Sequence, residues 1–131
     1  MKRIVNSRLI INAAAAVILS PTSLIEDYRH AVLDFIFAGF TGTIKVKVSN
    51  QELPPDFAAA VTPTNYWSFI NLVGRDDGGA TITGTTGIIT TALTGFRSYA
   101  VNSDAVRHIA VDVEVRSAGT VSVLLSAGTN A

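Results

Sequence analysis

The sequence contains no cysteine, only two histidines and no excess of charge of either sign. Without cysteine, the chain cannot form disulfide frameworks, thiolate nucleophiles or zinc sites built on cysteine. Ten basic residues balance ten acidic residues, so the basic excess with which nucleic-acid-binding proteins neutralise phosphates is missing. We therefore expect no nucleic-acid partner.

Charge is scarce as well as balanced. Charged residues make up 15% of the 131 residues, against roughly one quarter in soluble domains, whereas apolar residues make up 48%. This composition argues against disorder, and the length suits one domain with its own core. A surface so poor in charge indicates either a face covered by partners or a surface made polar by threonine, serine and glycine.

Long apolar runs are also absent. The longest run near the N-terminus, residues 13–19, falls far short of the roughly 20 residues of a membrane-spanning helix, so we expect no membrane partner. Polar residues such as Asn6 and Asn12 interrupt the apolar part of the N-terminal stretch before this run, which favours a structured arm or strand over a signal peptide. We divide the chain into this N-terminal arm or strand, residues 1–20, and a β-sandwich domain, residues 21–131.

Apolar residues at every second position are the strongest pattern present. Ile44, Val46 and Val48 alternate with polar residues, and the alternation returns from Ile109 to Leu125. This period is typical of a strand with one buried face. It predicts an antiparallel β-sandwich, jelly-roll or immunoglobulin-like, of about 7–9 strands. The other predicted strands cover 29–40, 66–73, 81–83, 87–91 and 96–101. Hairpin turns are predicted at 41–43 and 117–119, and a further turn at 84–86. Evidence for helices is thin, and the best candidates are residues 13–19 and 56–61.

Residues with reactive side chains do not form a recognisable catalytic set. His30 and His108 each follow an arginine at the start of a predicted strand, which favours structural roles. Asp112 and Glu114 share the outer face of one strand, where acids are usually solvated, and residues 76–79 favour a turn over a calcium loop. No nucleophile elbow or phosphate-binding glycine loop is present. We expect no enzyme activity, cofactor or metal; the alternative is a hydrolase using either histidine.

Partner contacts are expected at two places. Tyr66 and Trp67 are neighbours in a predicted strand, so one of the two points outward and can anchor an interface. The segment 51–65 is a long proline-rich loop, a length that is often functional. We expect deletion of residues 1–12 to leave the sandwich folded and to weaken assembly. The predicted contact residues are Ile4, Leu9, Ile10, Ile11 and Val17 in the arm, Pro54, Pro55 and Phe57 in the loop, and Tyr66 and Trp67.

A set of short motifs is spread along the chain in a fixed order: Pro55-Asp56-Phe57, Asn65-Tyr66-Trp67, Arg97, Asn102, Arg107 and Ser117 to Val121. With them, roughly residues 28–126 resemble small β-sandwich structural proteins encoded in the virion gene clusters of tailed bacteriophages. The four consecutive alanines of the N-terminal arm depart from that family's pattern.

The resemblance implies a non-enzymatic virion protein, assembled in the host cytoplasm. Within the virion we expect a capsid decoration or cement protein, a homo-oligomer whose partner is the major capsid protein or another virion protein. One alternative places it in the neck, tail or fibre. Another is a carbohydrate- or receptor-binding module that uses Tyr66 or Trp67.

Overall fold

The computed structural model describes residues 5–26, 28, 30–76, 79–102 and 106–128, and every regular element among them is a β-strand. The strands form one antiparallel sheet in the order β1-β9-β4-β8-β6-β7, with β2 and β3 paired to β9 and β5 paired to β4. The predicted all-β antiparallel fold is confirmed. The strands are β1 (Val5–Ala14), β2 (Ile18–Leu19), β3 (Ser23–Leu24), β4 (His30–Ser49), β5 (Ser68–Phe69), β6 (Leu72–Gly74), β7 (Thr81–Ile82), β8 (Ile88–Asn102) and β9 (His108–Gly128).

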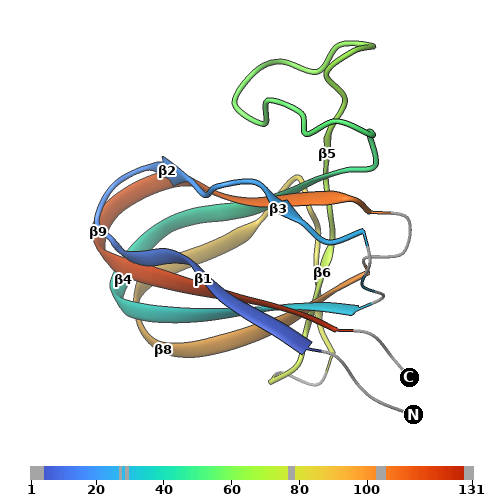
Figure 1. The fold of residues 1–131 in the computed structure, drawn as a ribbon. Helices are drawn as coiled ribbons and strands as arrows, with labels where there is room; N and C mark the ends of the chain where they lie inside the picture. Colours follow the sequence, from blue (N-terminus) through green and yellow to red (C-terminus); the bar gives the residue numbers. More distant parts are fainter. Residues whose placement is uncertain (1–4, 27, 29, 77–78, 103–105, 129–131) are drawn as a thin grey trace.

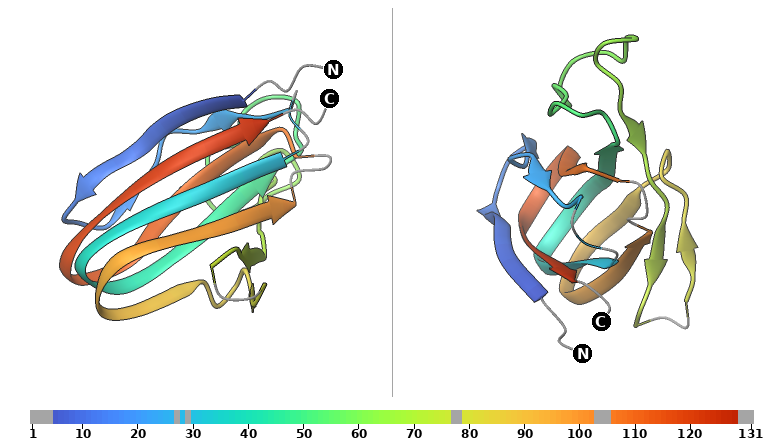
Figure 2. Two further views of the ribbon diagram at one scale, coloured as in Figure 1. Left: turned by 90° about the horizontal axis from the view of Figure 1, so that it is seen from below. Right: turned by 45° about the vertical axis from the view of Figure 1, so that its right-hand side comes forward.

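Three strands dominate the sheet. β4 has 20 residues, β8 has 15 and β9 has 21, whereas a strand in a globular protein usually has about 5–6 residues. β4 lies in the middle, with β9 antiparallel to it on one side and β8 on the other. Figures 1 and 2 show that all three curve back at the same end, so that one sheet folds over itself into two layers.

Both predicted hairpins are wrong. Thr41 of β4 pairs with Ala118 of β9, so both strands continue through the segments 41–43 and 117–119 instead of turning back on themselves. The third predicted turn, at 84–86, is present: the backbone N–H groups of Thr86 and Gly87 both donate to the carbonyl of Thr83.

The curved end of the sandwich is a row of β-bulges. Gly39, Ala92 and Gly119 have φ angles of +59°, +45° and +76°, in the left-handed region where glycine carries no steric cost. Register shifts occur next to these positions in the pairing of β4 with both β8 and β9. A bulge bends its strand and increases the local twist. The glycine-containing segments therefore act as corners of long strands.

The smaller elements also differ from the prediction. Residues 66–73 form two short strands, β5 and β6, instead of one. Neither predicted helix is present: residues 13–19 contain the end of β1 and then β2, and residues 56–61 begin with a turn in which the Ala59 N–H donates to the Asp56 carbonyl. Asp56 also accepts from the Ala58 N–H at 3.0 Å, a side-chain bond that favours a turn over a helix.

The core lies between the two layers and follows the predicted alternation. Phe35 stacks on Phe37 with ring centres 5.9 Å apart, and the ring of Tyr99 meets Phe35 edge-on. Every predicted inward residue of β9 is buried except Val115, which is 50% exposed. The pairing explains this exception, because a bulge at Glu114 shifts the alternation by one residue.

Candidate interaction surfaces

The connection between β4 and β5, residues 50–67, projects beyond the sandwich (Figure 1). Its side chains hold it in one shape. The Asn65 amide accepts from the Asp56 N–H at 2.7 Å and donates to the Asp56 carbonyl at 3.0 Å. Gln51 Oε1 accepts from the Tyr66 N–H at 2.9 Å and so joins the two ends of the segment. We call residues 50–67 the projecting loop.

Lys47 connects the projecting loop to the sheet. This lysine is only 8% exposed. Its Nζ donates to the Phe57 carbonyl at 2.9 Å, lies 3.2 Å from Asp112 Oδ2 and lies 4.3 Å from the centre of the Trp67 ring. A buried ammonium without such partners would be strongly destabilising. The loop and the β4–β9 pair therefore share one charged centre.

The residues predicted as loop contacts divide into two groups. Pro55 and Phe57 are buried against their own chain, so neither presents a surface to a partner. Trp67 is half-buried and its Nε1 donates to the Ala59 carbonyl at 2.9 Å. Tyr66 is the outward member of the aromatic pair. The exposed apolar side chains of the loop include Pro54 and Tyr66, both predicted as contacts, together with Leu53 and Val61, which were not among the predicted contacts.

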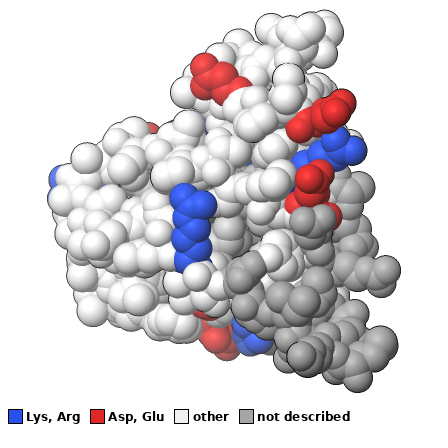
Figure 3. Space-filling view, in the orientation of Figure 1, with Lys and Arg blue, Asp and Glu red and all other residues white. Residues whose placement is uncertain are grey.

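A second surface lies where the two layers open. β1 extends the layer that contains the second half of β9, and β2 and β3 extend the layer that contains its first half. Among the described residues, no strand pairs with the outer side of β1. Figure 3 shows charged side chains to be sparse over this part of the surface. We call β1, β2, β3 and the residues between them the N-terminal edge; its exposed apolar side chains include Leu9 (50%), Val17 (61%), Ile18 (42%) and Leu24 (57%).

The predicted arm contacts are divided by a bulge. Leu9 and Val17 are exposed, whereas Ile10 and Ile11 are buried because the register shifts between Leu9 and Ile11. Ile4 lies outside the described residues. Deletion of residues 1–12 would remove two core isoleucines, so it is not the clean test of assembly that the sequence suggested.

The histidines and acids occupy structural positions. His30 and His108 begin β4 and β9, as predicted, and His108 is buried with its Nε2 3.4 Å from the Glu52 carbonyl oxygen. Glu114 is exposed, as expected, and its carboxylate lies 3.1 Å from Lys45 Nζ. Asp112 is only partly exposed and lies 3.2 Å from Lys47 Nζ.

The described part of the chain contains no cluster of three or more histidine, aspartate or glutamate side chains that could hold a metal ion, and no helix suited to crossing a membrane. Of the turn predicted at residues 76–79, positions 77 and 78 lie outside the described residues.

No protein-family model and no curated protein matches the sequence. The fold is similar to that of two solved structures. YomS, an SPBc2 prophage-derived protein, is 11% identical, with a TM-score of 0.72 over 98% of this chain and 96% of YomS. XepA, a PBSX exported protein, is 12% identical, with a TM-score of 0.72 over 98% of this chain but only 39% of XepA. At these identities the similarity shows a shared fold.

Proposed function

We propose that the protein is a non-enzymatic structural component of a bacteriophage virion, where it acts as a capsid decoration protein. Two lines support this proposal. The fold matches a prophage-derived protein over nearly the whole length of both chains, and the motifs from Pro55 to Val121 resemble those of phage virion proteins. In this role the protein packs on the major capsid protein, or on further copies of itself, and stabilises the head shell.

The N-terminal edge is the observation that carries the proposal. The unpaired side of β1 offers backbone N–H and C=O groups to a strand of another chain. Exposed apolar side chains lie in the same part of the molecule, on both layers, and their burial by a partner would favour association. A decoration protein needs a surface of this kind and no catalytic group.

Quantification of the protein in washed phage particles tests the proposal. Copies in the hundreds, together with binding of added protein to shells that lack it, support a decoration role. Copies in the tens or fewer would place the protein in the neck, tail or fibre instead. Absence from particles, with free protein in the culture medium, would overturn the virion assignment; export is the property named for XepA.

A second candidate function rests on Tyr66. This tyrosine is 54% exposed on a loop held in shape by its own hydrogen bonds, and rigid exposed aromatic residues serve as contacts for sugars and receptors. A glycan array should then show binding that Tyr66→Ala abolishes and Leu53→Ala, a change at another exposed loop position, leaves intact. No binding by the wild-type protein would exclude this function for the glycans tested.

A further inference from the structure

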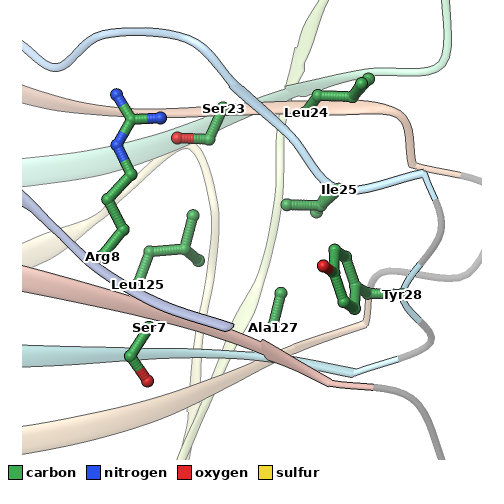
Figure 4. A pocket seen from close by; sticks show the side chains of 8 residues that line it. All are labelled: Ser7, Arg8, Ser23, Leu24, Ile25, Tyr28, Leu125 and Ala127. Atoms are coloured by element: carbon green, nitrogen blue, oxygen red, sulfur yellow. The ribbon is translucent and has the colours of Figure 1, made fainter. Parts of the chain in front are cut away.

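A pocket of about 380 Å³ opens at the N-terminal edge, between the two layers (Figure 4). The side chains that form its floor belong to the core: Ile25, Leu125 and Ala127 are each less than 5% exposed. Leu24 lies at the exposed side, and the half-buried ring of Tyr28 lies beside Ile25. The lining residues are Ser7, Arg8, Ser23, Leu24, Ile25, Tyr28, Leu125 and Ala127, and none of them is acidic.

The hydroxyl group of Ser23 lies in this pocket without a hydrogen-bond partner among the described residues. The residue is only 5% exposed. Among the described residues, its hydroxyl oxygen is the one buried side-chain polar atom without a hydrogen-bond partner. A buried hydroxyl without a partner costs free energy, and native proteins contain few of them. A ligand that bonds this hydroxyl would account for its presence.

Arg8 lies on the opposite side of the same pocket. It pairs with Leu125 across β1 and β9, and residues directly opposite one another share a face of the sheet. Because Leu125 is buried, Arg8 is on the inner face of its layer. Ser23 pairs with Ile109, which is 1% exposed, so it is on the inner face of the other layer. Figure 4 shows the Ser23 hydroxyl directed toward the side where Arg8 lies.

We infer that this pocket binds a small organic carboxylate, with the carboxylate between Arg8 and Ser23 and an apolar group on Ile25, Leu125 and Tyr28. The Arg8 side chain has no hydrogen bond or ion pair with any described residue, and a guanidinium matches the plane and the single charge of a carboxylate. The volume of about 380 Å³ lies within the roughly 300–1,000 Å³ that is usual for sites of small molecules. This inference does not depend on the virion role.

Two sources supply this chemistry: a free aliphatic acid, or the C-terminal carboxylate of a peptide with an apolar last residue. The test is a titration of the ¹⁵N-labelled full chain, followed by NMR, with hexanoate and with an N-acetylated pentapeptide that ends in leucine. Hexanamide, the peptide amide and inorganic phosphate are the controls. The tighter of the two carboxylates identifies the source.

We expect at least one of the two carboxylates to shift the NMR signals of the backbone N–H groups in β1 and β3. Hexanamide and the peptide amide should shift none of them. Arg8→Gln and Ser23→Ala should each weaken binding about tenfold, since each removes a hydrogen bond to a charged group. Arg97→Gln, which changes an exposed arginine of β8, should leave affinity unchanged. Ser23→Ala should also raise the unfolding temperature of the free protein, because it removes a buried hydroxyl without a partner.

Three results would overturn the inference. The first is no shift with either carboxylate. The second is equal binding of hexanamide or phosphate, because that excludes recognition of a carboxylate. The third is unchanged affinity in Arg8→Gln together with an unchanged or lower unfolding temperature in Ser23→Ala, because the serine would then be only structural.

Discussion

The centre of the sheet and the N-terminal edge both consist of antiparallel strands. Among the described residues, β4 at the centre is paired on both sides, whereas β1 at the edge is paired on one side only. β4 has a long neighbour on each side, and its inward side chains are almost fully buried. β1 has one neighbour, an open outer side and a bulge that divides exposed Leu9 from buried Ile11. The centre therefore accounts for folding, whereas the edge is the surface to which the proposed virion role assigns binding.

This difference shows why the two regions should respond oppositely to mutation. Substitutions in the centre act on the free energy of unfolding, because every inward position contributes to one packed core. If the proposed interface is right, substitutions at exposed positions of the edge should act on association and little on stability, because these side chains make few contacts within the isolated chain.

The largest effect on stability is expected at Val113, which is completely buried in β9. Val113→Asp places an unpaired carboxylate in the core and should lower the free energy of unfolding by about 4 kcal/mol or more, a large part of a domain's stability. Val115→Asp is the matched control, because Val115 is half-exposed on the same strand; its effect should stay within about 0.5 kcal/mol. Urea denaturation measures both. Equal losses would show that the bulge at Glu114 is misplaced.

The next largest effect is expected at the curved end of the sandwich. A Cβ at Gly119 would collide with the Gly39 carbonyl oxygen, and φ there is +76°, so Gly119→Ala should cost about 3 kcal/mol. Gly39→Ala meets nothing within 4 Å and carries only the conformational cost of a left-handed residue, about 1–2 kcal/mol. Thermal unfolding followed by circular dichroism compares the two. The reverse order would contradict the close approach of the two strands at this corner.

A smaller effect is expected where the projecting loop joins the centre. Lys47→Met leaves the Phe57 carbonyl and the Asp112 carboxylate without their partner, and should cost about 2 kcal/mol. Lys45→Met should cost less than about 1 kcal/mol, because its partner Glu114 is 41% exposed. Chymotrypsin should also cleave the loop faster in Lys47→Met only. Equal cleavage in both variants would show that Lys47 does not hold the loop.

The smallest effect on stability is expected at the edge. Leu9→Ser should change the free energy of unfolding by no more than about 0.5 kcal/mol, because Leu9 is half-exposed, but it should weaken binding to phage shells. Ile89→Ser, at an exposed position of β8, is the control and should bind like the wild type. Cosedimentation with shells measures binding. Weaker binding in both variants would mean that the N-terminal edge has no special role.

The alternating residues made the buried face predictable, because a period of two is a local property of the chain. Ile44, Val46, Val111 and Val113 are all inward, as the pattern indicated. The corners were not predictable in the same way. A glycine segment such as 117–119 suits both a hairpin turn and a bulge, and which one forms depends on whether a second long strand lies alongside.

The candidate site was less accessible from the sequence than the fold. Tyr66 could be predicted as one of an adjacent aromatic pair, of which one had to point outward. Ser23 and Arg8 gave no signal, because a serine and an arginine 15 residues apart gain meaning only when two layers face each other. Phe57 was misassigned as a contact because an aromatic residue in a long loop looks exposed until the loop folds over it.

Hydrogen–deuterium exchange of the β1 amides, in the free protein and in purified phage particles, tests whether the N-terminal edge is the contact surface in the virion. In the free protein β1 should exchange faster than β4 and β9, since it has one strand neighbour instead of two. In particles, exchange in β1 should slow by about tenfold or more while β4 stays unchanged. Unchanged exchange in β1, with slower exchange in residues 50–67 instead, would show that the projecting loop is the interface and that the N-terminal edge is not.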